Sequence, residues 1–456
     1  MILRDAEEWA GRSVVVLGLA KSGAAVAKLL HRLGAQVVVN DKKPREACPE
    51  AEELEALGIR VICGHHPDDL LTNGVDVLVK NPGIPYSAAP VRQAQEMGIP
   101  VITEVEVSGR LTASRLVGIT GSNGKTTTTS LVGQMLSAGG ISSRVAGNIG
   151  MALSEVVQET RPEEWLVVEL SSFQLKGTER FHPKVAALLN VVPAHLDYHG
   201  TMEDYITSKQ RLFRNQTSED AAVFNWDNPV CRETAASVKS RVWWFSRRET
   251  VPRGAMVEDG WVHLRTDERK IPLLPVKEVA LPGAHHLENA LAAAVIAHLC
   301  GCPADAIANV LRTFRGVEHR LEYVGTVEGV AYYNDSKATN AQAAIRALES
   351  FDQPIVWIGG GLDRGVDFHE LVPVFAQRVK AVVAYGQSAP ILLARAEEAG
   401  VPIRLGVKDV AEAVAEASKA AQPGDVVLLS PACASWDMYT SFEERGSIFK
   451  QAVHRL

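Results

Sequence analysis

The stretch Gly118–Ser130, GITGSNGKTTTTS, decides the central part of the predicted fold. Leu116–Thr120 is apolar and predicts a buried strand, Gly121–Gly124 predicts a tight turn, and the threonines from Thr126 begin a helix. This order predicts a phosphate cradle, because the backbone N–H groups of the turn and the helix N-terminus attract anions. The common pattern G-x-x-x-x-G-K-[ST] would need glycine at Ile119, so this loop is a variant. A helix cap with a surface lysine would leave the threonines, which are poor helix formers, unexplained.

A phosphate cradle also needs cationic and metal-binding groups nearby. Lys125 can neutralise the β and γ phosphates of a nucleotide, and the hydroxyl of Thr126 or Thr127 can bind Mg²⁺. Glu169 ends the apolar run WLVVEL, where an acid at the carboxyl edge of a parallel sheet faces the ligand crevice unless it forms a surface ion pair. His195 follows the next apolar run and is a candidate metal ligand or polar contact, although a lone histidine is often structural.

The composition is that of a soluble globular protein. The chain has 456 residues, 46% of them hydrophobic, which is about three times the length of a typical domain. A formal net charge of -7 gives no general attraction to nucleic acid or anionic membranes. The start, MILRDAEEWAG, is unlike a signal peptide, and no apolar run reaches the roughly 18 residues of a membrane span. We therefore expect a cytoplasmic protein without membrane insertion, with six reduced cysteines.

Short runs rich in Val, Ile and Leu recur along the chain, each followed by a turn and a helix-like stretch. This rhythm is typical of buried parallel strands with helical crossovers and predicts an α/β fold. Runs such as SVVVLG, WLVVEL and PIVWIGGG group into three blocks, which we place at 1–105, 106–316 and 317–456. Within the middle block, residues 223–281 contain VWWFS, WVHLR and KIPLLP, which predict a small insert of short antiparallel strands.

The first block contains a second glycine turn. In VVVLGLAKSG, Gly18 and Gly23 flank Ala20, and Asp41 closes the next strand, so the spacing approaches the dinucleotide fingerprint G-x-G-x-x-G. The middle glycine is missing. The turn is therefore compatible with a dinucleotide site, with a nucleotide diphosphate at the helix N-terminus, or with a plain strand-to-helix connection.

Polar clusters follow the strands of the last block. The motif NDSKATN lies before a predicted helix, where a lysine and free N–H groups attract an anion, although helix capping explains it equally well. In WIGGGLDRG, three glycines precede Arg364, whose guanidinium suits bidentate binding of a carboxylate. In SPACASWDMYTSFEERG, Ser441 and Glu444 have capping-box spacing, and Ser435 is unassigned. The polar members of NDSKATN are Asp335, Ser336, Lys337 and Thr339.

Taken together, GITGSNGKTT, GNIG, VVELSSFQL, NVVPAHLDYHG, YITSKQRLF, GVEHRLE, NDSKATN and SPACASWDMYTSFEERG resemble, in this order, the Mur ligases of peptidoglycan synthesis. That family has a phosphate loop of the short form G-x-x-G-K-[ST]. The resemblance implies a Rossmann-like N-terminal domain for the UDP substrate, a central P-loop ATPase domain and a Rossmann-like C-terminal domain for the amino acid. It also implies ATP-dependent addition of D-glutamate to UDP-N-acetylmuramoyl-L-alanine through an acyl phosphate, by a monomer that uses two Mg²⁺ ions.

The resemblance implies the site residues position by position. The UDP substrate would contact Gly18, Ala20, Lys21, Ser22, Gly23, Asp41, Asn81 and Asn148. ATP would contact Gly121, Ser122, Asn123, Gly124, Lys125, Thr126, Thr127, Asn289, Arg320 and Asp335. D-Glutamate would contact Lys337, Thr339, Arg364, Ser435 and Phe442. The metal ligands would be Thr126, Glu169, His195 and Lys209, and the catalytic residues Lys125, His195 and Lys209.

Lys209 shows what the resemblance adds. The local sequence YITSKQRLF predicts a solvated helix lysine at this position. The resemblance instead implies a carbamylated side chain whose new carboxylate binds the second Mg²⁺. Two positions depart from the family. Ala194 replaces an acidic residue found in many relatives, and Arg364 replaces a lysine found in some, so the local metal and carboxylate geometry is open there.

Other functions remain alternatives at this point. A folate polyglutamate synthetase, or a Mur relative specific for another amino acid, would differ in the amino acid that stimulates phosphate release. A nicotinamide-dependent oxidoreductase built on the Gly18–Gly23 turn would bind reduced cofactor and leave Gly118–Thr128 unexplained. A nucleotide-switch protein would hydrolyse ATP or GTP without a co-substrate.

Overall fold

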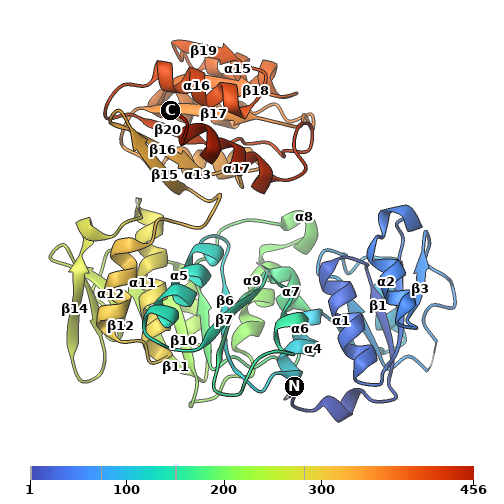
Figure 1. Cartoon of the computed structure of the whole chain (residues 1–456). Helices are drawn as coiled ribbons and strands as arrows, with labels where there is room; N and C mark the ends of the chain where they lie inside the picture. The colour runs from blue at the N-terminus through green and yellow to red at the C-terminus, as the bar shows by residue number, and fades with distance from the viewer. Residues whose placement is uncertain (1–2, 73, 149–150, 282) are drawn as a thin grey trace. The chain divides into compact units, whose positions relative to one another are not determined.

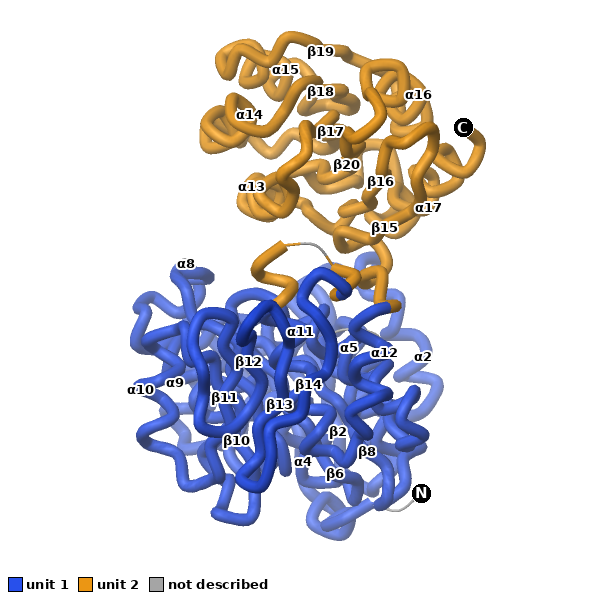
Figure 2. Tube along the Cα trace, turned by 90° about the vertical axis from the view of Figure 1, so that its left-hand side faces the viewer, with its two compact units in different colours: residues 1–278, 288–312 blue, residues 279–287, 313–456 orange. Residues whose placement is uncertain are grey.

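The computed structural model describes residues 3–72, 74–148, 151–281 and 283–456, which form three β-sheets flanked by helices (Figure 1). They belong to two compact units, coloured separately in Figure 2. Unit 1 contains residues 1–278 and 288–312, and unit 2 contains residues 279–287 and 313–456. The predicted α/β fold with three sheet-based domains is confirmed. The exact boundaries at 105 and 316 stay a prediction, although they do separate the three sheets.

The first sheet has five parallel strands in the order β3-β2-β1-β4-β5. From β1 the chain first adds strands on one side of the sheet (β2, β3) and then on the other (β4, β5), so the strand order changes direction between β1 and β4. Ligand crevices form at such switch points, outside the carboxyl ends of the strands. The turn after β1 and the loop after β4 both lie there. The strands are β1 (Ser13–Leu17), β2 (Gln36–Asp41), β3 (Arg60–Cys63), β4 (Val77–Lys80) and β5 (Val101–Ile102). The helices are α1 (Lys21–Arg32), α2 (Glu50–Ala56) and α3 (Ala89–Glu96).

The second sheet has nine strands in the order β14-β13-β12-β11-β10-β9-β6-β8-β7. Strands β8, β9 and β10 are buried along their whole length, as expected for parallel strands covered on both faces. The parallel strands are β6 (Arg115–Thr120), β7 (Ser143–Gly147), β8 (Trp165–Glu169), β9 (Val185–Leu188), β10 (Ala221–Asn225), β11 (Arg241–Ser246) and β12 (Gly254–Glu258). The helices are α4 (Glu104–Leu111), α5 (Lys125–Ala138), α6 (Leu153–Val156), α7 (Ser172–Lys176), α8 (Leu196–His199), α9 (Met202–Gln210), α10 (Pro229–Ala235), α11 (Ala284–Leu299) and α12 (Ala304–Thr313).

The predicted antiparallel insert is partly wrong. The run VWWFS forms β11, which pairs in parallel with both β10 and β12. A helix, α10, joins β10 to β11, and such a crossover returns the chain in the same direction. The chain first reverses at Asp259 and Gly260, both with positive φ, as a two-residue hairpin turn requires. Only β13 (Trp261–Arg265) and β14 (Lys270–Pro275) are antiparallel, and they extend the central sheet.

The third sheet has six strands in the order β15-β16-β20-β17-β18-β19, parallel except for β15. Alternate residues of β17 enter different apolar clusters, Trp357 on one face and Ile358 on the other, so both faces are covered. The strands are β15 (Glu322–Val327), β16 (Val330–Asn334), β17 (Ile355–Gly360), β18 (Val379–Tyr385), β19 (Ile403–Gly406) and β20 (Val426–Leu429). The helices are α13 (Ala341–Leu348), α14 (Val372–Arg378), α15 (Ala389–Glu398), α16 (Val410–Ala420) and α17 (Phe442–Val453).

Candidate active site

The predicted phosphate loop has the expected strand-turn-helix geometry. Strand β6 ends at Thr120 and helix α5 begins at Lys125, so the turn between them presents its N–H groups at the helix N-terminus. Gly124 has φ of 81°, and a Cβ there would lie 2.1 Å from the Asn289 side-chain oxygen. Only glycine fits this position. The contact also places Asn289, an expected nucleotide residue, against the loop.

The loop is braced by the segment that follows β9. The backbone N–H of Ser122 donates to the Asn190 carbonyl at 2.9 Å, and the N–H of Asn123 donates to the Asn190 side-chain oxygen at 2.9 Å. The Ser122 hydroxyl donates to the Val192 carbonyl at 3.0 Å. Sequence analysis did not single out Asn190. The sequence feature that could have identified Asn190 is its position: it is a polar residue just after the buried strand β9, at the sheet edge that carries the phosphate loop.

Two lysines converge on one carbonyl of the loop. Lys125 donates to the carbonyls of Gly121 at 2.9 Å and Ser122 at 3.1 Å, and Lys209 donates to the same Gly121 carbonyl at 2.9 Å. Burial, and after it the Lys125 ammonium, lowers the pKa of Lys209 well below its usual range. The turn therefore gathers two lysine side chains, and Lys125 at the helix N-terminus suits it to a polyphosphate. Lys209 is not the solvated lysine that its sequence context alone suggested.

Glu169 presents one carboxylate oxygen that the protein does not use. The Asn148 side-chain amide donates to Oε1 at 2.9 Å, which fixes the plane of the carboxylate. Oε2 is buried and has no hydrogen-bond partner among the described residues. An oriented carboxylate with a spare oxygen at the carboxyl edge of β8, beside β6, fits a hard cation such as Mg²⁺. Thr126, another expected ligand, is buried in the first turn of α5.

His195 is exposed and lies in an aromatic cluster beside the phosphate loop. It has φ of 57° and precedes the single turn α8. Its ring lies 5.0 Å from that of Phe173 and 6.3 Å from that of Tyr205. The hydroxyls of Tyr205 and Ser122 are hydrogen-bonded 2.9 Å apart. Sequence analysis missed Tyr205, which joins this cluster to the loop.

The N-terminal turn packs tightly. A Cβ on Gly23 would lie 2.1 Å from the Gly18 carbonyl oxygen, so this position also needs glycine. The Asp41 carboxylate accepts from the N–H groups of Leu19 at 2.7 Å and Lys43 at 2.9 Å, and so shapes the turn. Nearby expected contacts at the start of α1 or in the loop after β4 are Ala20, Lys21, Ser22 and Asn81.

Unit 2 brings three strand-end loops together around one buried guanidinium. Arg445 donates to the Ser336 hydroxyl and carbonyl at 3.0 and 2.7 Å, to the Gly360 carbonyl at 3.4 Å and to the Cys433 carbonyl at 3.0 Å. These residues follow or end β16, β17 and β20, whose loops carry most of the expected amino-acid contacts. Sequence analysis did not identify Arg445, because its partners are remote in the chain.

The expected residues of unit 2 lie on these loops. Lys337 lies 5.0 Å from the Phe442 ring centroid, and the Ser435 hydroxyl is buried without a partner among the described residues. Arg364 lies 5.1 Å over the exposed Trp436 ring, and Thr339 is exposed. Burial raises the pKa of Asp335 to about 7, while hydrogen bonds from the Ser430 hydroxyl and the Leu321 N–H oppose this shift. Ser441 caps α17 by accepting from the Glu444 N–H, as predicted.

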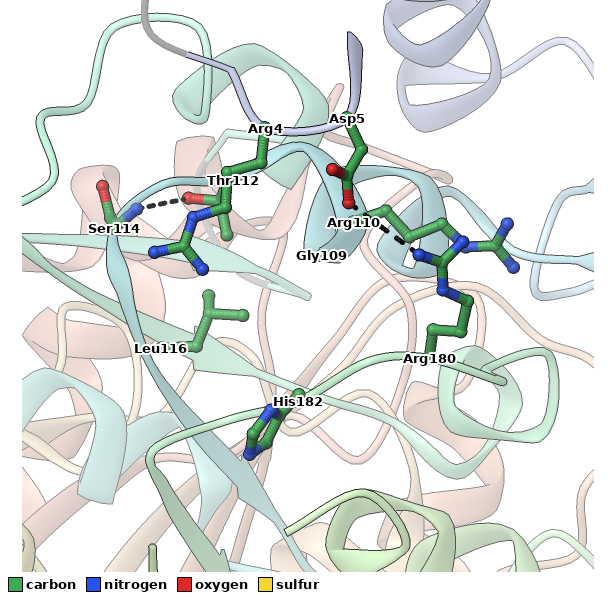
Figure 3. Close-up of a pocket in the computed structure, with 9 residues that line it drawn as sticks. All are labelled: Arg4, Asp5, Gly109, Arg110, Thr112, Ser114, Leu116, Arg180 and His182. Carbon is green, nitrogen blue, oxygen red and sulfur yellow. Dashed lines mark hydrogen bonds and ion pairs between the residues drawn. The ribbon is translucent and has the colours of Figure 1, made fainter. Parts of the chain in front are cut away.

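A polar cavity of about 170 Å³ lies near the start of β6, at the edge of the central sheet opposite the one that carries the phosphate loop (Figure 3). Figure 3 shows Asp5 and Arg180 facing one another at its rim. Three of its basic side chains have carboxylate partners, which offsets their attraction for an anion, and Arg4 donates to the Ala113 carbonyl. The pairs include Arg110 with Glu106, Arg180 with Glu8, and His182 with Asp220.

The chain matches three family models in order: the Mur ligase MurD-like N-terminal domain over residues 12–103, the Mur ligase middle domain over 119–297 and the glutamate ligase domain over 319–433. It is 51% identical over 446 residues to the UDP-N-acetylmuramoylalanine–D-glutamate ligase of Geobacillus kaustophilus, covering 98% of each chain. The chain belongs to the Mur ligase family. The Bacillus cytotoxicus protein of the same name is 48% identical over the full length of both chains.

Solved structures agree with this Mur ligase fold. The MurF ligase of Thermotoga maritima in complex with ADP aligns with a TM-score of 0.56 at 19% identity, covering 100% of this chain and 98% of that one. MurF from Acinetobacter baumannii aligns with a TM-score of 0.57 at 18% identity, covering 98% and 93%. Within the described residues of this Mur ligase, no helix has the length and apolar character to cross a membrane.

Proposed function

We propose that this Mur ligase joins D-glutamate to UDP-N-acetylmuramoyl-L-alanine and converts ATP to ADP and phosphate. The observation that carries the reaction type is the phosphate loop on which Lys125 and Lys209 converge, beside the oriented carboxylate of Glu169. The full-length similarity to ligases named for D-glutamate supports the choice of amino acid. We further propose a cytoplasmic monomer.

The reaction proceeds through an acyl phosphate. A carboxylate oxygen of the substrate attacks the γ-phosphorus. The bond between this phosphorus and the oxygen that bridges the β and γ phosphates breaks, which releases ADP. The amine of D-glutamate attacks the acyl carbon and loses a proton. The C–O bond to the phosphate then breaks, and phosphate leaves with the electron pair. Lys125 and the backbone N–H groups of the loop stabilise the charge that collects on the transferred phosphoryl group.

Magnesium fits this site. Glu169 and Thr126 would hold the ion, and when bound it neutralises charge between the substrate carboxylate and the phosphates. Asn148 would keep the Glu169 carboxylate in place. His195 and a carbamylated Lys209 are proposed to complete the ligands of two ions. The lowered pKa of Lys209 supports this, because only a neutral amine attacks CO₂ to form a carbamate, with loss of one proton.

Phosphate release with three amino acids tests the proposed function. With ATP, Mg²⁺ and UDP-N-acetylmuramoyl-L-alanine, we expect rapid release with D-glutamate and background release with L-glutamate or a diamino acid. Stimulation by a diamino acid alone would assign the chain to another Mur activity. Hydrolysis that needs no amino acid would point to a nucleotide switch.

Glu169→Gln tests the metal assignment. The amide keeps the size of the side chain but removes its charge, so the Mg²⁺ concentration for half-maximal activity should rise by about 10- to 100-fold. Activity should recover partly at high Mg²⁺. Glu163→Gln, at an exposed position before β8, is the control. An unchanged Mg²⁺ dependence in Glu169→Gln would contradict its assignment as a metal ligand.

A further inference from the structure

A buried lysine lies where the first sheet meets the central part of unit 1. Lys80 is the last residue of β4, and its side chain is 1% exposed. The ammonium donates to the carbonyls of Asn81 and Pro82, both at 3.2 Å, and to the Tyr198 hydroxyl at 3.1 Å. The ammonium also lies 4.9 Å from the centroid of the Tyr86 ring, and no carboxylate among the described residues pairs with it. A buried cation without a counter-charge costs stability, so Lys80 needs another reason to be there.

Tyr198 contributes the other half of this contact. It lies in α8, three residues after His195. Its hydroxyl lies 3.0 Å from the Pro82 carbonyl and 3.2 Å from the Ile84 carbonyl, so its single hydrogen lies within reach of both acceptors, and its oxygen accepts from Lys80. The Tyr198 hydroxyl therefore joins α8 to two carbonyls of the loop 81–84, and Lys80 bonds both to this loop and to that hydroxyl. We call Lys80 and Tyr198 the latch.

On one side, the latch contacts the expected UDP site. The Asn81 N–H donates to the Leu17 carbonyl at 2.7 Å, beside the glycine turn. A Cβ added to Gly18 would lie 2.7 Å from the Asn81 Cβ and 2.9 Å from the Ile84 side chain. The loop 81–84 and the turn after β1 therefore pack with no space between them, and a shift of the loop would change the turn.

On the other side, the latch is connected to the phosphate loop by contacts between aromatic side chains. Tyr198 packs edge-on against Phe173 at 4.4 Å and His199 at 5.0 Å, and His199 lies 5.2 Å from Tyr205. Tyr205 is hydrogen-bonded to Ser122 of the phosphate loop. The latch is thus part of one continuous set of contacts, within unit 1, from the turn after β1 to the phosphate loop.

We propose that Lys80 and Tyr198 are positioning residues that hold the loop 81–84 at a fixed place relative to the phosphate loop, so that the bound UDP substrate presents its carboxylate to ATP. This inference rests on the proposed function, because it takes the loop as part of the UDP site. Burial, with a smaller effect of the Lys176 ammonium, lowers the pKa of Lys80 to about 7, which agrees with a strained rather than stabilising placement. The latch acts on binding of the UDP substrate and leaves ATP binding unchanged.

Tyr198→Phe and Lys80→Met test the latch. Tyr198→Phe removes one hydroxyl, and at saturating ATP and D-glutamate the KM for UDP-N-acetylmuramoyl-L-alanine should rise by about 3- to 10-fold. Lys80→Met should raise it further and have a melting temperature equal to or above that of the unchanged protein, because a buried charge is removed. The dissociation constant of ADP should change less than twofold in both variants. The controls are Tyr323→Phe, at an exposed hydroxyl, and Lys239→Met, at an exposed lysine.

The outcomes separate the latch from a structural role and from the proposed function. The double variant should show less than the sum of the two single effects, because both residues act on the same loop. An unchanged KM in Tyr198→Phe overturns the latch. So does a rise in KM that comes with a similar fold-increase in the dissociation constant of ADP and with a lower melting temperature. Calorimetric binding of the UDP substrate needs no turnover. It should weaken in both variants even if another amino acid proves to be the co-substrate, which would contradict only the proposed function.

Discussion

Lys125→Ala is expected to lower phosphate release by at least about 1000-fold, since a cation on a transferred phosphoryl group contributes this much in related chemistry. The side chain emerges from the first residue of α5, and its ammonium reaches the carbonyls of Gly121 and Ser122 at the turn. A phosphate bound in that turn would therefore meet it directly. The loss should be in kcat as well as in ATP binding, because charge on the γ-phosphoryl group develops during transfer.

A matched control is Lys239→Ala, which removes an exposed lysine from the same unit. It should retain near-normal turnover. Both variants should melt within a few degrees of the unchanged protein, which calorimetry or circular dichroism can verify. Turnover of Lys125→Ala close to that of Lys239→Ala would remove Lys125 from the phosphate site and leave the loop as a capped helix start.

The parts of the site that sequence predicts are local. A strand, a glycine turn and a helix are specified by neighbouring residues, so β6, Gly124 and α5 could be placed from the sequence. The same reasoning placed Glu169 at the carboxyl edge of its strand. Parallel strands bring such edges together whatever the length of chain between them, which is why these residues lie at one edge of the central sheet.

The residues that sequence reasoning missed act through remote partners. Arg445 is a charged residue within a helix pattern, and only the fold shows that it binds carbonyls at the ends of three strands. Lys80 ends an apolar strand and has its partner, Tyr198, 118 residues away. The predicted antiparallel direction of β11 was also wrong, because the composition of a strand does not show whether a helical crossover or a hairpin precedes it. The Asp259–Gly260 turn, a strong hairpin signal, marks where the chain does reverse.

The second large effect is expected for Lys209→Met. This lysine is buried, and its ammonium shares the Gly121 carbonyl with Lys125, so two like charges compete for one acceptor. Such an arrangement is costly if both side chains stay cationic. Conversion of Lys209 to a carbamate would replace repulsion by attraction to Lys125 and to a metal ion. The lowered pKa of Lys209 favours this conversion, because it raises the fraction of the neutral amine, the form that reacts with CO₂.

Lys209→Met keeps the apolar stem and removes the nitrogen, so it should fold while phosphate release falls at least about 100-fold, as loss of a metal-supporting group does. Lys239→Met should be unaffected. If the carbamate is the active form, depleting bicarbonate and CO₂ should lower the activity of the unchanged protein, and adding bicarbonate should restore it, whereas Lys209→Met should not respond. Equal activities of Lys209→Met and Lys239→Met would return Lys209 to an ordinary structural role. A large loss without any response to bicarbonate would assign Lys209 to the phosphate site as a cation, and the second metal ion would then need other ligands.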